Sequence, residues 1–261
     1  MMKQNQPFYI ISHSPWPIIL SLNLINMFMN MINWLNMKNK SLMIISFLML
    51  FIISLLWWRD IIRESSLLGF HTFKIYTMLK WSMILFIISE LLLFISFFWN
   101  FFHNSIIPNY NLMNFWPPKS IYTFNYLEIP LLNTMILLIS SIFITWSHYA
   151  LINQKHKNMM ISLIITIILG IYFICLQIFE YYHAKFNFFD SIYSSSFFIA
   201  TGFHGIHVII GSLFLLSISI RQMIFFMSSS HHFNFEGASW YWHFVDLIWL
   251  FLFISIYWWS N

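Results

Sequence analysis

Long apolar stretches, separated by short polar segments, dominate the chain. A helix rises 1.5 Å per residue, so about 20 apolar residues are needed to cross the hydrocarbon core of a bilayer. Trp or Tyr stands at several ends of these stretches, as is typical of residues at a membrane interface. Seven stretches of about this length each predict a transmembrane helix: residues 16–34, 42–58, 81–102, 129–149, 159–181, 194–220 and 240–258.

The composition agrees with this pattern. Of the 261 residues, 60% are hydrophobic and only 8% are charged, which is more apolar surface than a water-soluble domain of this size buries in one core. The apolar runs are too continuous for the alternating strands of an outer-membrane barrel. We therefore predict an all-α membrane protein with seven transmembrane helices.

The positive charges indicate orientation and partners. The twelve Lys and Arg residues are scattered between apolar runs, so the net charge of +4 favours lipid headgroups over nucleic acid as the anionic partner. Eight of the twelve fall on the side of the membrane that carries the N-terminus, which predicts that the N-terminus faces the inside and the C-terminus the outside. The longest polar connection, residues 59–80, suggests a grouping of two helices plus five.

Glu90 is the main candidate for interior chemistry. It lies nine positions from both Trp81 and Trp99, which places it about 13 Å from either interface. An ionised carboxylate facing lipid at that depth costs roughly 2.5–3.5 kcal/mol, so Glu90 must be protonated, paired or directed toward other helices. A polar clamp between helices, a proton-handling role and simple burial all remain open for it.

A partner for Glu90 is available at the same depth. His207 lies midway along its predicted span, which suggests a hydrogen bond to Glu90, and His204 and Asp246 are the next candidates for a buried polar network. The alternative interpretation is ligation of a metal or haem by His204 and His207, because residues at i and i+3 share one helical face. That spacing alone is a weak signal, and no multi-cysteine metal site is available because the chain has one cysteine.

Two further patterns have simpler interpretations. Thr201, Gly205 and Ser212 form a stripe of small residues on one helix and predict close approach of a neighbouring helix. The adjacent His231 and His232 are interpreted as a solvated pair in a loop.

A charged cluster follows the second predicted span, in the segment "WWRDIIRESSLLGFHT". An ordinary charged end of a membrane helix explains it, with Arg63 and Asp60 able to pair at i, i+3. The alternative is a phospholipid site, in which cations hold the phosphate and indole rings lie against the glycerol. The candidate lipid-binding residues are Trp57, Trp58, Arg59, Arg63, His71 and Arg221.

Several sequence motifs together carry a resemblance to a known family. They include "SPWP", "WWRDIIRES", "IPLLNT", "FEYY", "ATGFHGIHVIIGS", "HHFNFE" and "WYWHFVDLIWLFLF", in this order along the chain. On these segments the chain resembles subunit III of the haem-copper cytochrome c oxidases, in the mitochondrially encoded form, over essentially its whole length.

The resemblance implies a fold and a role. It implies helices grouped as two plus five around a V-shaped lipid cleft, which we divide as residues 1–72 and 73–261. It also implies a non-catalytic subunit without metal or haem of its own, supporting subunits I and II, which hold the haem and copper, beside accessory subunits. The resemblance further implies bound phospholipids (phosphatidylglycerol, phosphatidylethanolamine or cardiolipin). It also implies the mitochondrial inner membrane as the location, with the N-terminus in the matrix and the C-terminus in the intermembrane space.

Overall fold

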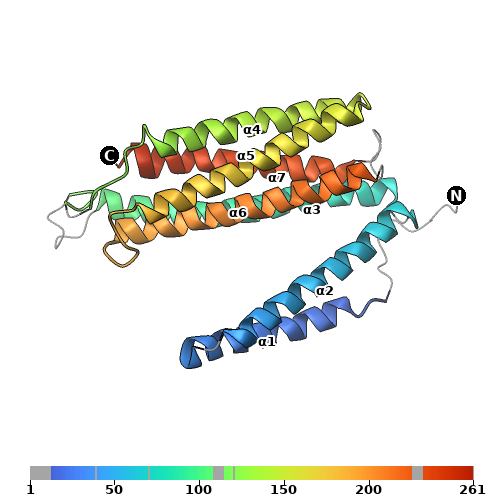
Figure 1. Ribbon diagram of the computed structural model, residues 1–261, viewed down its shortest axis with the longest axis horizontal. Coiled ribbons are helices and arrows are strands. Elements are labelled where there is room, and N and C mark those ends of the chain that lie inside the picture. The colour runs from blue at the N-terminus through green and yellow to red at the C-terminus, as the bar shows by residue number, and fades with distance from the viewer. Residues whose placement is uncertain are drawn as a thin grey trace. The chain divides into compact units, whose positions relative to one another are not determined.

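The computed structural model describes residues 13–38, 40–69, 71–107, 115–119, 121–224 and 232–260. Within these ranges the regular structure is helical, with no strand. Among the described residues, seven helices are long and apolar enough to cross a membrane, so the predicted fold class is confirmed (Figure 1). They are α1 (Trp16–Met37), α2 (Ser41–Ser66), α3 (Phe73–Ile106), α4 (Ile129–Ile152), α5 (His156–Tyr182), α6 (Ile192–Met223) and α7 (Phe233–Leu252), which continues as a π-helix, η2 (Phe253–Trp258).

The helices are longer than hydropathy predicts. The segment 59–80, expected to be a long polar loop, is mostly helical, because α2 continues to Ser66 and α3 begins at Phe73. This expectation was wrong because charged residues end the apolar run without ending the helix. A helix can continue beyond the hydrocarbon core, because its backbone groups stay hydrogen-bonded to one another in water as well.

The chain divides between Leu79 and Lys80 into two compact units. The boundary expected from the sequence follows residue 72, and the observed division falls slightly later, within the first turns of α3. The first unit therefore holds α1 and α2, and the second holds most of α3 together with α4 to α7.

In the first unit, α1 and α2 pack as a helical hairpin. Lys38 ends α1 in the left-handed backbone region, with φ of 55°, and its N–H donates to the carbonyl of Trp34. Asparagine side chains then link the two helices: the amide of Asn23 donates to the Ser46 carbonyl at 3.1 Å. No apolar side chain of α1 or α2 is buried. Such polar contacts therefore hold the two helices of the hairpin in register.

In the second unit, α4, α5, α6 and α7 pack around a common core. The neighbouring pairs are α4 with α5, α5 with α6, α6 with α7, and α7 with α4, so the four helices close on one another. Trp242 of α7 lies in this core with only 1% of its surface exposed, and its indole N–H donates to Ser140 of α4 at 2.9 Å. This large side chain is thus buried with its single donor satisfied.

Local signals start some of these helices. α6 begins with a capping box, in which Ser191 Oγ accepts from the N–H of Ser194 at 3.0 Å and Ser194 Oγ accepts from the N–H of Ser191 at 2.9 Å. Proline occupies the first turn of α1 and of α4, where its missing N–H costs no helical hydrogen bond.

α3 joins the second unit through large aromatic side chains. The ring of Phe94 lies edge-on to His207 of α6, at 5.0 Å between centroids, and Phe97 lies 5.1 Å from Phe203. Phe94 is completely buried. These contacts bring the middle of α3, where Glu90 stands, against α6.

Candidate functional site

Glu90 and His207 form a hydrogen bond between α3 and α6. His207 Nε2 lies 3.0 Å from Glu90 Oε2, and 24% of the Glu90 side chain is exposed within the protein. The Phe94 ring of α3 packs edge-on against the His207 ring. The acid at the predicted midplane is therefore directed toward another helix and has a partner there.

The second nitrogen of His207 determines what this pair can do. His207 Nδ1 lies 2.7 Å from the carbonyl oxygen of Phe203. A carbonyl only accepts, so Nδ1 carries a hydrogen. Nε2 then either accepts from the neutral acid or donates, as imidazolium, to the carboxylate. Both arrangements have zero net charge and share one proton in the Glu90–His207 bond, which is the state that costs least in hydrocarbon.

His204 lies one turn from His207 but has a different partner. Its Nε2 donates to the carbonyl of Val245 in α7 at 3.1 Å, while the ring packs against Phe173 and Trp249 at centroid distances of 5.4 and 5.1 Å. Only 1% of His204 is exposed. His204 thus ties α6 to α7, whereas His207 ties α6 to α3.

Asp246 is buried, but it does not extend the Glu90–His207 pair. Its polar neighbour is Ser141 of α4, and its Oδ1 has no hydrogen-bond partner among the described residues. The four residues proposed as one network thus form separate contacts between different helix pairs in the described part of the chain.

Ligation of a metal or haem was the alternative interpretation of His204 and His207. Both ring nitrogens of His207 bond within the helix bundle. His204 uses Nε2 for the Val245 carbonyl, and its buried Nδ1 has no hydrogen-bond partner among the described residues.

Close helix approach occurs at glycines other than the one expected. A methyl group on Gly205 would meet no atom within 4 Å, so its place in the predicted stripe was wrong. On Gly170 of α5 a methyl carbon would lie 2.6 Å from Cη2 of Trp242, and on Gly211 of α6 it would lie 3.0 Å from Cε3 of the same ring. Gly170 and Gly211 make the room that the Trp242 indole occupies.

A further buried acid, Glu180, was missed in the sequence analysis. Glu180 of α5 is only 1% exposed, and neither of its carboxyl oxygens has a hydrogen-bond partner within the described residues. Its buried polar neighbour is Tyr257, which in turn lies near Gln177. The signal that marked Glu90, an acid beside an apolar run, was also present in "CLQIFEYY".

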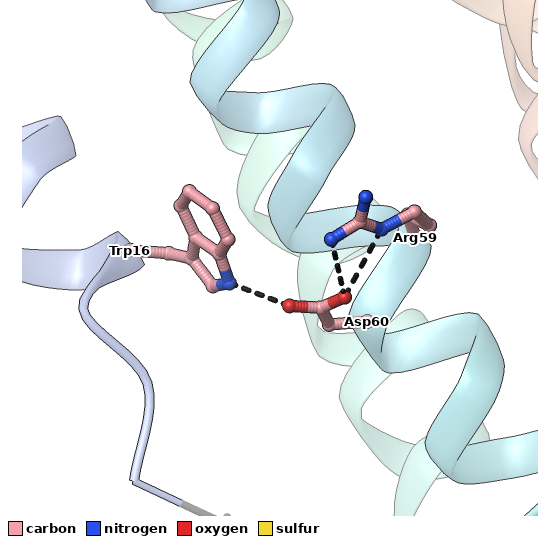
Figure 2. A network of polar contacts seen from close by, with 3 residues as sticks. All are labelled: Trp16, Arg59 and Asp60. Atoms are coloured by element: carbon pink, nitrogen blue, oxygen red, sulfur yellow. Dashed lines mark hydrogen bonds and ion pairs between the residues drawn. The ribbon is translucent and has the colours of Figure 1, made fainter.

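Figure 2 shows a network of polar contacts among Trp16, Arg59 and Asp60 in the first unit. The indole N–H of Trp16 in α1 donates to Asp60 Oδ2 at 2.7 Å, and Arg59 donates from Nε and Nη2 to Asp60 Oδ1, both at 3.1 Å. The hydrogen-bonded cation of Asp60 is thus Arg59, and Arg63 acts on it only as a nearby charge. Asp60 thus fastens the start of α1 to the last turns of α2.

The other proposed lipid-binding residues are distributed over both units. Trp58 is 57% exposed, Arg63 is exposed, and Trp57 and His71 are half-buried. These residues belong to the first unit and Arg221 to the second. Arg221 stands in the last turn of α6, where its Nε and Nη1 are buried without a hydrogen-bond partner among the described residues.

The loop histidines differ from expectation. His231 lies outside the described residues, but His232 is 9% exposed, so its interpretation as a solvated side chain was wrong. His232 precedes α7, and its Nε2 lies 3.3 Å from Oε1 of Glu236 one turn later. The i, i+4 spacing in "HHFNFE" carried this signal.

Among the described residues, seven apolar helices, several of them linked by hydrogen bonds of interior polar side chains, define a polytopic α-helical membrane protein. Residues 6–261 match the family model described as Cytochrome c oxidase subunit III. The chain is 47% identical over 261 residues to "Cytochrome c oxidase subunit 3" of Loxodonta africana and 48% identical over 261 residues to that of Myxine glutinosa, covering 100% of both chains in each comparison. It is 47% identical over 257 residues to the protein of that name from Drosophila melanogaster, covering 98% of each.

The chain therefore belongs to the cytochrome c oxidase subunit III family. The resemblance inferred from the motifs is confirmed.

Proposed function

We propose that this chain is a non-catalytic core subunit of cytochrome c oxidase, respiratory complex IV, in the mitochondrial inner membrane. In this role it supports the catalytic subunit while electrons pass from cytochrome c to oxygen and protons are pumped. The proposed partners are subunits I and II, which hold the haem and copper, together with accessory subunits. The excess of Lys and Arg on one side favours an N-terminus in the matrix.

The observation that carries this proposal is how the interior polar groups are used. Glu90 bonds to His207, His204 bonds to the Val245 carbonyl, and Trp242 bonds to Ser140. Each bond joins two different helices, so these groups stabilise the arrangement of the helices. The family match over residues 6–261 indicates which enzyme the chain would support, namely cytochrome c oxidase.

Removing this chain from the purified oxidase tests the proposal. We expect the depleted enzyme to retain its haem and copper and an initial oxygen-reduction rate within twofold of the complete enzyme, because the proposed role requires no redox centre in this chain. The rate should then fall during sustained turnover. Optical spectra and oxygen consumption measure both quantities, and a Soret band on the isolated full chain would contradict the proposal.

We also propose that the chain binds structural phospholipids. The support in the second unit is Arg221, whose guanidinium has two buried nitrogens without a partner among the described residues. A buried cation without an anion is costly, and a phosphate group suits the planar donor set of arginine. In the first unit, the exposed indole of Trp58 suits the region just below a headgroup.

Arg221→Met provides the test of lipid binding. We expect the variant to lose about one phospholipid per chain, because the headgroup phosphate loses its charged donor. Native mass spectrometry of the detergent-solubilised assembly counts the retained lipids. Lys157→Met is the matched control, since it removes the same charge from an exposed position at the start of α5. Equal lipid retention in both variants argues against a site at Arg221.

A further inference from the structure

A cluster of titratable side chains lies where α4 ends and α7 begins. His148 stands in the last turns of α4, His232 precedes α7, and Glu236 follows in the first turn of α7. One nitrogen or oxygen atom from each of these three side chains lies within 4.8 Å of the other two. The cluster is separate from the Glu90–His207 pair.

The two imidazoles are incompletely bonded. His148 Nε2 and His232 Nδ1 are buried and have no hydrogen-bond partner within the described part of the chain. The His148 ring is held by stacking on Phe235, at 5.5 Å between centroids and 14° between planes, and lies 5.8 Å from the His232 ring. A buried nitrogen without a partner is unfavourable unless another group bonds to it.

The distances suit coordination of a small cation. His232 Nε2 and Glu236 Oε1 are 3.3 Å apart. Ligand bonds of about 2.0–2.2 Å in a tetrahedron place neighbouring ligand atoms about 3.3–3.6 Å apart. A ring nitrogen of His148 lies within 4.8 Å of the ligand atoms of His232 and Glu236.

The types of donor select the class of metal. Calcium and magnesium prefer oxygen ligands throughout, whereas two imidazoles and one carboxylate suit zinc and similar divalent transition metals. Three protein ligands leave a fourth position for water. We propose that His148, His232 and Glu236 bind a divalent cation of the zinc class, although the sequence led us to expect no metal in this chain.

Lys80 sets the strength of this site. Its Nζ lies 2.8 Å from Glu236 Oε2, the carboxylate oxygen opposite the one that faces His232. The ammonium shares the carboxylate with the cation and repels it at short range. Zinc binding is therefore weaker than the ligand set alone allows.

Zinc titration of the full chain in detergent tests the site. After chelation and dialysis, we expect Zn²⁺ to bind at one site per chain in competition with a fluorescent chelator. His148→Gln, His232→Gln and Glu236→Gln should each weaken this binding at least tenfold. His183→Gln is the matched control, because His183 is an exposed imidazole after the end of α5. The Zn²⁺ affinity of this variant should equal that of the unmodified chain.

Two measurements remain decisive if a ligand variant unfolds, which circular dichroism detects. Lys80→Met should bind Zn²⁺ at least threefold more tightly, because repulsion is removed. Zinc K-edge absorption of the unmodified chain should report two imidazoles and a carboxylate. Unchanged affinity in the folded ligand variants, or zinc coordinated by oxygen alone, overturns the proposal and leaves an adventitious ion only.

Discussion

Replacing Gly170 with alanine is expected to destabilise the second unit by about 1–3 kcal/mol, the usual range for overpacking a core. The added methyl carbon would lie 2.6 Å from Cη2 of Trp242, too close for any van der Waals contact. Alanine is favoured over glycine in a helix by about 1 kcal/mol, but this gain is smaller than the clash. The indole cannot easily move, because it is 1% exposed and bonded to Ser140.

Two other glycines make the test specific. Gly211→Ala places its methyl carbon 3.0 Å from Trp242, so we expect a smaller loss of stability, and Gly205→Ala meets nothing within 4 Å and should be neutral or stabilising. Unfolding of the full chain in detergent, followed by circular dichroism, ranks the three variants. Adding Trp242→Phe to Gly170→Ala should recover part of the loss. A Gly205 variant as unstable as the Gly170 variant contradicts this account.

Hydropathy was sufficient to predict the seven helices because each span in lipid must satisfy its own backbone. The ends of the helices were less predictable. Residues 59–66 and 73–80 are charged or mixed in character, and a hydropathy pattern treats them as loop although the helices continue through them. The error is confined to positions where the chain leaves the hydrocarbon core.

The sequence predicted the depth of each residue in the membrane, because residues can be counted along a helix. It did not predict the rotation of each helix about its axis. Matched depth led to Glu90 and His207, which do bond. His204, one turn away, bonds to Val245 of α7 instead. The same limitation explains why close approach was expected at Gly205 and occurs at Gly211. Which face of a helix meets which neighbour depends on the packing of the whole bundle.

Contacts near the helix ends were hardest to foresee. His148 and Glu236 are far apart in the chain and are brought together only because α4 packs against α7. Hydropathy carries no information about such pairs, since both residues lie beyond the most apolar part of their spans. Only the local spacing of His232 and Glu236 was visible beforehand.

Replacing His207 with leucine is expected to cost about 1–3 kcal/mol, because it leaves the Glu90 carboxyl without its partner in the bundle interior. Glu90→Gln should cost less. His207 Nδ1 donates to the Phe203 carbonyl, so Nε2 is able to accept from an amide N–H as it does from a neutral acid. Denaturant unfolding of the full chain and the yield of assembled oxidase measure both variants.

The double variant Glu90→Leu/His207→Leu distinguishes the stabilisation by the Glu90–His207 hydrogen bond from the cost of burying one polar group without its partner. Replacing both members of a buried pair by apolar groups of similar size is often nearly neutral, whereas removing one is not. We therefore expect the double variant to be more stable than His207→Leu alone. If instead Glu90→Gln abolishes assembly, an ionised carboxylate is required there, and the pair acts as an imidazolium and a carboxylate.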